Sequence, residues 1–344
     1  MLAVFDGHND ALTHDDHADL AAGRSGGHLD LPRMREGGMR GGIFAVFTPS
    51  PEESSGRRRF SGTAYREPLA KPVEQGPAAA HATAVAGRLL RLERERQVRV
   101  ARMAADLDIA LADASSPPVA VLHLEGAEAI DPGLEALDQW HAAGLRSLGP
   151  VWSRANAFAH GVPFAFPSSP DIGPGLTDAG RTLLKRCGEL GILVDLSHMN
   201  EAGFWDTARL EAGPLVASHS GAHALCPASR NLTDAQLDAI GSSGGLVGVV
   251  FATAFLRPDF GDTPDTPLAL IVDHVRYVAE RIGPQHVALG SDFDGATVPA
   301  ELGDVAGLPK LVEALRHAGF GEDELEAICW HNWRRVLGAW WRDE

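Results

Sequence analysis

Five short segments of the sequence each place a histidine or a carboxylate directly after an apolar run. They are Asp6-Gly7-His8-Asn9-Asp10, His123-Leu124-Glu125-Gly126, Asp195-Leu196-Ser197-His198, Ser218-His219-Ser220 and Gly290-Ser291-Asp292-Phe293-Asp294. Imidazole and carboxylate groups without a competing thiolate form a ligand set that suits zinc and similar divalent metals. A lone histidine is more often an ordinary core or surface residue, so the inference depends on these segments meeting in space.

The spacing of these residues predicts two metal ions rather than one. His8 and Asp10 stand two positions apart on an extended segment, so both side chains can reach the same ion. His198 and His219 are then available to a second ion. Glu125 has two carboxylate oxygens and can bridge two ions about 3.5–4 Å apart. We therefore predict a binuclear site with five protein ligands.

Asp292 is the residue that we expect to move protons at this site. A divalent metal lowers the pKa of bound water from about 15.7 to about 7, which makes that water nucleophilic near neutral pH. Hydrolysis of an amide also needs a proton acceptor for the water and a donor for the leaving nitrogen. Asp292 is not needed as a ligand and fits this acid/base role. Its alternative role, as a third ligand of one ion, stays open.

Other histidines and basic residues are interpreted as structural or solvated. The segment His14-Asp15-Asp16-His17 looks like a ligand cluster, but its residues are crowded in a predicted surface loop. The run Arg57-Arg58-Arg59 is expected to be a solvated loop. The remaining isolated histidines with this interpretation are His160, His223, His274 and His331.

A regular alternation of strands and helices must position the five segments. Eight short, mostly continuous apolar runs are typical of parallel strands that are buried on both faces. The predicted strands are Leu2–Phe5, Gly42–Phe47, Val119–Leu124, Arg146–Val151, Ile192–Leu196, Leu215–Ser218, Leu246–Phe251 and Val287–Gly290. The predicted helices are Ala78–Ala112, Gly133–Ala143, Asp178–Leu190, Asn200–Glu211, Asp234–Ile240, Pro267–Ile282, Leu308–Ala318 and Asp323–Trp340.

This alternation predicts an α/β protein with a (β/α)8 barrel of the TIM type and a C-terminal helical extension. The carboxyl ends of all barrel strands lie on one face, which brings the five segments together. A doubly wound open sheet is the alternative, since the order of the strands cannot be read from the sequence. We expect one hydrolase domain over residues 1–344, with a loop insertion over Pro49–Pro77 that is rich in proline, glycine and serine.

Composition excludes several classes of partner. The chain has 344 residues, 44% of them hydrophobic and 22% charged, with a formal net charge of -16. Such an acidic protein repels nucleic acid and anionic membranes, so neither is expected as a partner. Its three cysteines form no CxxC pair, and its first residues lack a basic segment of the secretory type. We expect a cytoplasmic protein that binds a small-molecule substrate, and a homodimer is compatible with its size.

The quoted segments, together with Ser229-Arg230-Asn231, resemble the membrane (renal) dipeptidase family of binuclear zinc peptidases and in particular its bacterial members. They occur in the family order over residues 6–295. The resemblance implies a (β/α)8 barrel with two zinc ions, one held by His8 and Asp10 and one by His198 and His219, with Glu125 as the bridge. It also implies that Asp292 is the acid/base residue. Arg230 matches the arginine that binds the terminal carboxylate of the dipeptide, for which a guanidinium is a natural partner.

The sequence departs from the family pattern after the fourth predicted strand. Family members commonly carry a histidine there that contacts the scissile carbonyl, whereas this chain has Trp152 or Ser153 at that position, depending on a one-residue gap. His160 lies slightly downstream as an alternative. The departure bears directly on the substrate preference of the site.

The main hypothesis from the sequence is hydrolysis of L,L- or L,D-dipeptides by metal-activated water. A second hypothesis keeps the metal pair and changes the substrate to N-acyl amino acids or other small acids. A third is a catalytically silent barrel, against which the complete ligand set and Asp292 argue.

Overall fold

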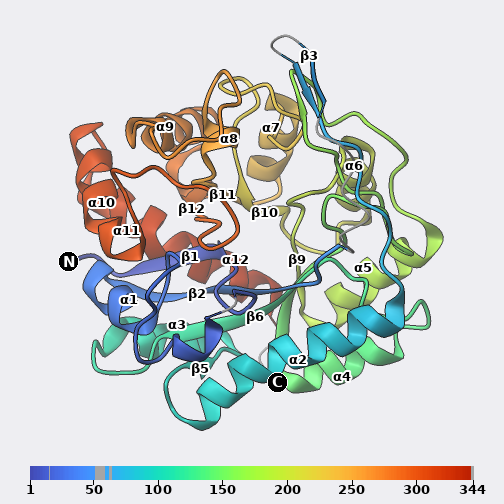
Figure 1. Ribbon diagram of the computed structural model, residues 1–344, viewed down its shortest axis with the longest axis horizontal. Helices are drawn as coiled ribbons and strands as arrows, with labels where there is room; N and C mark the ends of the chain where they lie inside the picture. The colour runs from blue at the N-terminus through green and yellow to red at the C-terminus, as the bar shows by residue number, and fades with distance from the viewer. Residues whose placement is uncertain (15, 51–58, 62–63, 342–344) are drawn as a thin grey trace.

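The computed structural model describes residues 1–14, 16–50, 59–61 and 64–341 (Figure 1). Its central feature is a ring of eight parallel strands, each of which overlaps one of the predicted strands. They are β1 (Val4–Asn9), β2 (Met39–Phe47), β6 (Val119–Glu125), β7 (Leu145–Gly149), β9 (Leu193–Val194), β10 (Val216–Ser220), β11 (Leu246–Val249) and β12 (Val287–Leu289).

The strands are ordered as in a closed barrel. Hydrogen bonds join β1-β2-β6-β7-β9 in one run and β10-β11-β12 in another. Isolated parallel bridges, Asp195 to Val216 and Asn9 to Phe293, connect the two runs at both of their ends. The ring is therefore closed, which confirms the barrel and excludes the open sheet.

Most predicted helices lie on the outside of this ring, with ends that agree within a few residues. They are α4 (Glu135–Ala143), α5 (Asp178–Leu190), α6 (Glu201–Leu210), α7 (Asp234–Ser242), α9 (Ala269–Ile282) and α10 (Leu308–His317). The side chains of Thr177, Asn200 and Thr233 accept backbone N–H bonds at the starts of α5, α6 and α7. Such N-caps satisfy donors that have no partner inside the helix. Two short helices, α1 (Leu31–Gly37) and α8 (Thr253–Leu256), were not predicted.

The single helix predicted over Ala78–Ala112 is wrong. The segment contains α2 (Gln75–Arg94), the short strand β5 (Arg99–Val100) and α3 (Ala104–Ala112). Arg96 has a left-handed backbone with φ of 57°, which ends α2, and β5 then pairs with β6. The heavily charged composition of this stretch favours helix, but pairing of β5 with the first residues of β6 overrides that preference.

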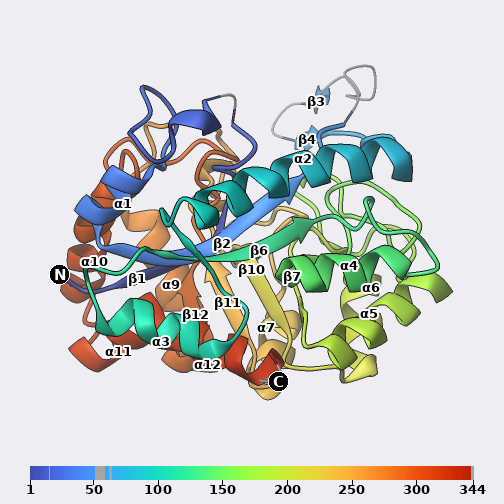
Figure 2. The ribbon, with the colours of Figure 1, turned by 90° about the horizontal axis from the view of Figure 1, so that it is seen from below.

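The predicted insertion contains a hairpin in the part that the structure describes. β3 (Arg59–Ser61) and β4 (Ala64–Arg66) are antiparallel, and β4 pairs with β8 (Ala165–Phe166). Arg57 and Arg58 of the predicted solvated run lie outside the described residues. The hairpin projects beyond the carboxyl ends of the strands (Figure 2).

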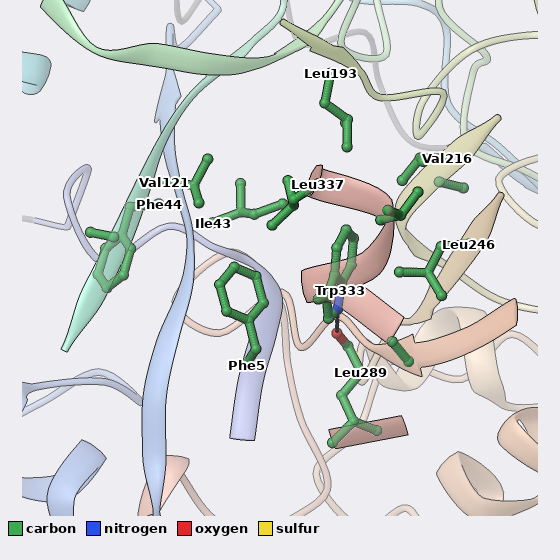
Figure 3. Packing of buried hydrophobic residues seen from close by; sticks show 14 of the residues in the cluster. Phe5, Ile43, Phe44, Val121, Leu193, Val216, Leu246, Leu289, Trp333 and Leu337 are labelled. Atoms are coloured by element: carbon green, nitrogen blue, oxygen red, sulfur yellow. Dashed lines mark hydrogen bonds between the residues drawn. The ribbon is translucent and has the colours of Figure 1, made fainter. Parts of the chain in front are cut away.

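The chain ends in helices that fill the barrel from the side where its strands begin. α11 (Glu322–Glu326) and α12 (Asn332–Trp340) are joined by a π-helical turn over Ala327–His331. Trp333 of α12 points into the ring, where it packs near Phe5 and donates from Nε1 to the carbonyl oxygen of Leu289 at 3.0 Å (Figure 3). A Cβ at Gly7 would stand only 2.3 Å from this indole, so glycine is required there. Within the described residues, no helix is long and apolar enough to cross a lipid bilayer.

Candidate metal centre

The five predicted ligands meet at the carboxyl ends of the strands. One oxygen of Glu125, Oε1, lies 3.8 Å from Nε2 of His8, 3.1 Å from Nε2 of His198 and 3.7 Å from Nε2 of His219. Asp10 Oδ2 lies 3.6 Å from the same nitrogen of His8. A single carboxylate therefore faces three imidazole nitrogens that come from three different strand ends.

The ligand atoms form two overlapping groups. In one, His8, Asp10 and Glu125 have ligand atoms within 4.8 Å of one another, and in the other Glu125, His198 and His219 do. Glu125 is common to both groups. The first group is rich in carboxylate and the second is rich in imidazole.

Asp292 lies at the same centre, with a carboxylate oxygen that forms a third group with His8 and His219. This position is compatible with both roles left open by the sequence. Asp292 and His198 have left-handed backbones, with φ of 61° and 66°. Such conformations are costly for residues other than glycine and are concentrated at functional sites. From these positions both side chains reach the centre.

Gly295 allows the two aspartates of the centre to approach each other. A Cβ at this position would lie 2.2 Å from Oδ2 of Asp10 and 2.4 Å from Oδ1 of Asp292. Any larger residue would therefore displace one of the two carboxylates.

A second layer of side chains holds the histidines of the imidazole-rich group. Nδ1 of His219 lies 2.7 Å from Oγ of Ser218, which donates to Oδ2 of Asp195 at 2.5 Å. Nδ1 of His198 lies 2.9 Å from Oγ of Ser153. Ser153, one of the two residues that can stand at the histidine position of the family pattern, thus contacts a ring of the centre. The sequence placed Asp195 and Ser153 near the site but did not indicate these contacts.

Burial and neighbouring charges shift the pKa values of the groups at this centre away from their ordinary values. Burial raises the pKa of Glu125 to about 8 and the pKa of Asp292 to about 7. Burial acts to lower the pKa of His8, but the surrounding Glu125, Asp10 and Asp292 carboxylates outweigh it and raise that pKa to about 10. Burial and the positive charges of Arg230 and His8 hold the pKa values of His198 and His219 well below the ordinary value.

The residues fit a metal site. Both ring nitrogens of His8 are buried and have no hydrogen-bond partner among the described residues. A buried polar atom without a partner is costly, and a metal ion at Nε2 would satisfy it. Cations between these groups would also compensate the buried carboxylates of Asp10 and Glu125.

Arg230 lies beside the imidazole-rich group. Its Nε donates to Nδ1 of His198, and its terminal nitrogens donate to Oγ of Ser220 and to the carbonyl oxygen of His219, each at 3.1 Å. The guanidinium also lies over the ring of Phe255, 5.7 Å from its centre. Arg230 is buried and is the cation nearest to the histidine pair.

A cavity of about 390 Å³ opens onto the centre. Asp10, Glu125, His198 and Asp292 form part of its lining, and Trp152 lines it as well. His160, the alternative to the missing histidine, is not among the described residues that line this cavity.

Two of the histidines interpreted as structural have ordinary polar contacts. His14 contacts Asp16, which also accepts from Arg24. His274 is buried between the N–H of Ala222 and the carbonyl oxygen of Leu256.

Comparison with known proteins identifies the family. The family model described as membrane dipeptidase, peptidase family M19, matches residues 1–340. The crystal structure of a metallopeptidase of family M19 described as dipeptidase AC is 46% identical, with a TM-score of 0.92 and 99% of each chain covered. A metallopeptidase from Rhodobacter sphaeroides, solved with a phosphinate mimic of the dipeptide L-Ala-D-Ala, is 44% identical, with a TM-score of 0.92 and 99% of each chain covered.

A curated relative extends the comparison to fungi. Dipeptidase ataJ of Aspergillus terreus is 29% identical over 98% of this chain and 84% of its own length. The barrel, the cluster of ligand atoms and the match over residues 1–340 agree with one another. The chain therefore belongs to the membrane dipeptidase family, peptidase family M19.

Proposed function

We propose that this protein hydrolyses L,L- or L,D-dipeptides at a binuclear zinc site held by His8, Asp10, Glu125, His198 and His219. As a member of family M19 the chain is a metallo-dipeptidase, and the proposal concerns the metal, its ligands and the roles of single residues. The observation that carries it is the position of one Glu125 oxygen, within 3.8 Å of three imidazole nitrogens. The dipeptide mimic bound by the Rhodobacter sphaeroides relative supports the substrate class.

When bound, the two metal ions supply Lewis acidity that polarises the amide carbonyl and makes water nucleophilic near neutral pH. The chain supplies the proton transfers. Asp292 is half-buried beside His8 and His219, and desolvation raises its pKa to about 7. A group with such a pKa can take a proton from water and return it to the leaving nitrogen at neutral pH.

Arg230 binds the free carboxylate of the dipeptide. If His198 held an ion through Nε2, its ring proton would stand on Nδ1 and would donate to Oγ of Ser153, which lies 2.9 Å away. The Nε–H of Arg230, which donates to that Nδ1 in this structure, would then lack this acceptor. It would be available to a substrate carboxylate, for which a guanidinium is a strong partner.

Two further predictions from the sequence are kept in the proposal. Residues 1–344 form one domain, which the closed ring of strands and its filling by α12 support. The protein acts in the cytoplasm, and its free cysteines Cys187, Cys226 and Cys329 fit a reducing compartment. A homodimer stays a prediction.

Metal analysis and a dipeptide panel test the proposal together. We expect about two zinc ions per chain, release of free amino acids from L,L- or L,D-dipeptides, and loss of turnover with a chelator. Asp292→Asn should keep both ions and lose turnover, whereas loss of one ion would make Asp292 a ligand.

Arg230→Ala should impair cleavage of a free dipeptide far more than cleavage of its carboxamide. No turnover on a broad panel after zinc is restored would reject the dipeptidase.

A further inference from the structure

The cavity beside the metal centre has an aromatic wall formed by Phe47, Trp152, Phe164 and Phe255, all of which line it. The rings form a continuous series, with centres 5.1 Å apart from Phe47 to Trp152, 5.8 Å from Trp152 to Phe164 and 5.9 Å from Phe164 to Phe255. All four side chains are only partly buried. Their exposed ring surface therefore faces a space that a ligand can enter, and covering it is favourable.

A buried ion pair fixes one end of this aromatic wall. The guanidinium of Arg154 is fully buried and lies 5.5 Å from the ring centres of both Phe47 and Trp152. It is held there by Oε1 of Glu128 at 2.7 Å and by the carbonyl oxygen of Thr48 at 2.6 Å. Cation–π contact with a cation that cannot move keeps these two rings in place before any ligand arrives.

The inserted hairpin supports the other end of the wall. Tyr65 of β4 packs against Phe260 with ring centres 5.2 Å apart, and Phe166 of β8 stacks on the same ring at 5.3 Å. Phe164 and Phe255 pack against this small apolar cluster. The insertion thus has a structural consequence for the cavity, because it backs the two rings nearest to Arg230.

The wall begins beside the residue proposed to bind the substrate carboxylate. Arg230 lies over the ring of Phe255. Phe164 and Trp152 both lie within 6.3 Å of the His198 ring, measured between ring centres. A residue whose carboxylate reaches Arg230 can therefore place its own side chain against the Phe255, Phe164 and Trp152 end of the wall.

The charged residues of the cavity complement this arrangement. Among the described residues that line it, the carboxylates are Asp10, Glu125, Asp262, Asp292 and Asp294, and there is no lysine or arginine. An acidic side chain on the substrate would face these carboxylates, since Arg230 is already occupied by the terminal carboxylate, and would be repelled. An apolar side chain on the wall would instead contact ring surface.

We propose that the aromatic wall is the subsite for the carboxyl-side residue of the dipeptide and that it selects a large apolar side chain, such as leucine or phenylalanine, over an acidic one. This inference rests on the proposed dipeptidase function and on Arg230 as the carboxylate partner. Trp152, whose ring lines this wall, is then a specificity-determining residue.

The test measures kcat/KM of the zinc-loaded protein on a matched series, L-Ala-D-Leu, L-Ala-D-Ala and L-Ala-D-Glu, with the L,L isomers alongside. We expect leucine to exceed alanine by about 30-fold, as burial of its larger apolar side chain implies, and glutamate to be the poorest. The reversed dipeptide L-Leu-D-Ala, which carries leucine on the amino side, should not show this gain.

Variants locate the selectivity. Trp152→Ala and Phe164→Ala should lower the leucine-to-alanine ratio by about 10-fold, whereas Trp152→Phe should retain most of it. Trp205→Ala, which removes an aromatic side chain on α6 beyond the cavity lining, is the matched control and should leave the ratio unchanged. The ratio is insensitive to a partial loss of folded enzyme.

Failure of the proposed dipeptidase function and failure of the proposed subsite give different results in this experiment. If no dipeptide is cleaved after zinc is restored, the proposed function itself is rejected. Cleavage with a preference for glutamate, or an unchanged ratio in both alanine variants, would overturn the subsite while leaving the dipeptidase intact. A change confined to L-Leu-D-Ala would assign the wall to the amino-side residue and overturn the proposal as stated.

Discussion

At the end of the barrel where the strands begin, Trp333 and Leu337 of α12 belong to a continuous apolar core, whereas at the opposite end His8, Glu125 and His219 are equally buried. The first end lowers the free energy of the fold, because apolar area leaves water. The second end costs free energy in the absence of metal, because charged groups are desolvated. The same ring of strands thus carries stability at one end and chemistry at the other, and substitutions at the two ends should have separable effects.

The largest effect is expected at the polar end. His219→Ala removes one of the two imidazoles of the second metal group and should lower kcat/KM by about 10³-fold or more, because Lewis acidity supplies several kcal/mol to the transition state. The folded state of the metal-free protein should be hardly affected. Steady-state kinetics, metal analysis and thermal unfolding of the metal-free protein check this. His14→Ala, a histidine outside the ligand groups, is the control, and equal losses in both variants would contradict the assignment.

Trp333→Ala should instead reduce the packing of the apolar end. Removing a fully buried tryptophan side chain and its hydrogen bond to Leu289 should lower the free energy of unfolding by about 3–5 kcal/mol. Zinc content and KM of the remaining folded protein should stay close to those of the parent. Denaturant unfolding measures the change. A variant as stable as the parent would show that the indole does not fill the barrel as described.

Asp195→Asn tests the residues that hold the metal-site histidines in place, between the apolar end and the polar end of the barrel. The Asp195 carboxylate accepts from Ser218, which contacts His219. Loss of its charge should weaken zinc binding by about 10–100-fold, as for other residues that orient a metal-bound histidine. Competition with a chromophoric chelator measures the affinity. Unaltered affinity together with reduced stability would place Asp195 with the structural end.

The smallest effect concerns protons at the polar end. The Glu125, Asp10 and Asp292 carboxylates raise the pKa of His8 to about 10, so His8 holds a proton at pH 7 in the metal-free protein. Ligands must be deprotonated, so zinc binding should release protons and weaken about 10-fold per pH unit for each proton displaced as pH falls. Calorimetric titration in buffers of different ionisation enthalpy checks the release. Heats that are independent of the buffer would rule it out.

The strands and the clustering of the five proposed ligands were predictable from the sequence for a shared physical reason. Parallel strands that are buried on both faces appear in the sequence as continuous apolar runs. Each site segment begins at the polar residue that follows or interrupts such a run, as at Asp6 and Asp195. The family resemblance added Arg230, which no local pattern singles out.

Features that depend on contacts between distant segments were not predictable. The break between α2 and α3 follows from the left-handed Arg96 and from pairing of β5 with β6, neither of which has a periodic signal. The contact of Ser153 with His198 joins two loops, and the series of rings joins the end of β2 (Phe47), two loop residues and α8 (Phe255). These segments lie far apart in the sequence, and no local pattern indicates that they meet.

The indole of Trp333 also has a consequence for biosynthesis. It packs beside Phe5 and excludes any side chain from Gly7, next to the first proposed zinc ligand. Since this indole comes from α12, the interior of the barrel beside β1 stays unfilled in a nascent chain until α12 has been synthesised. The barrel is therefore expected to close only after α12 has left the ribosome, and a chain truncated before Trp333 should be degraded by proteases instead of folding.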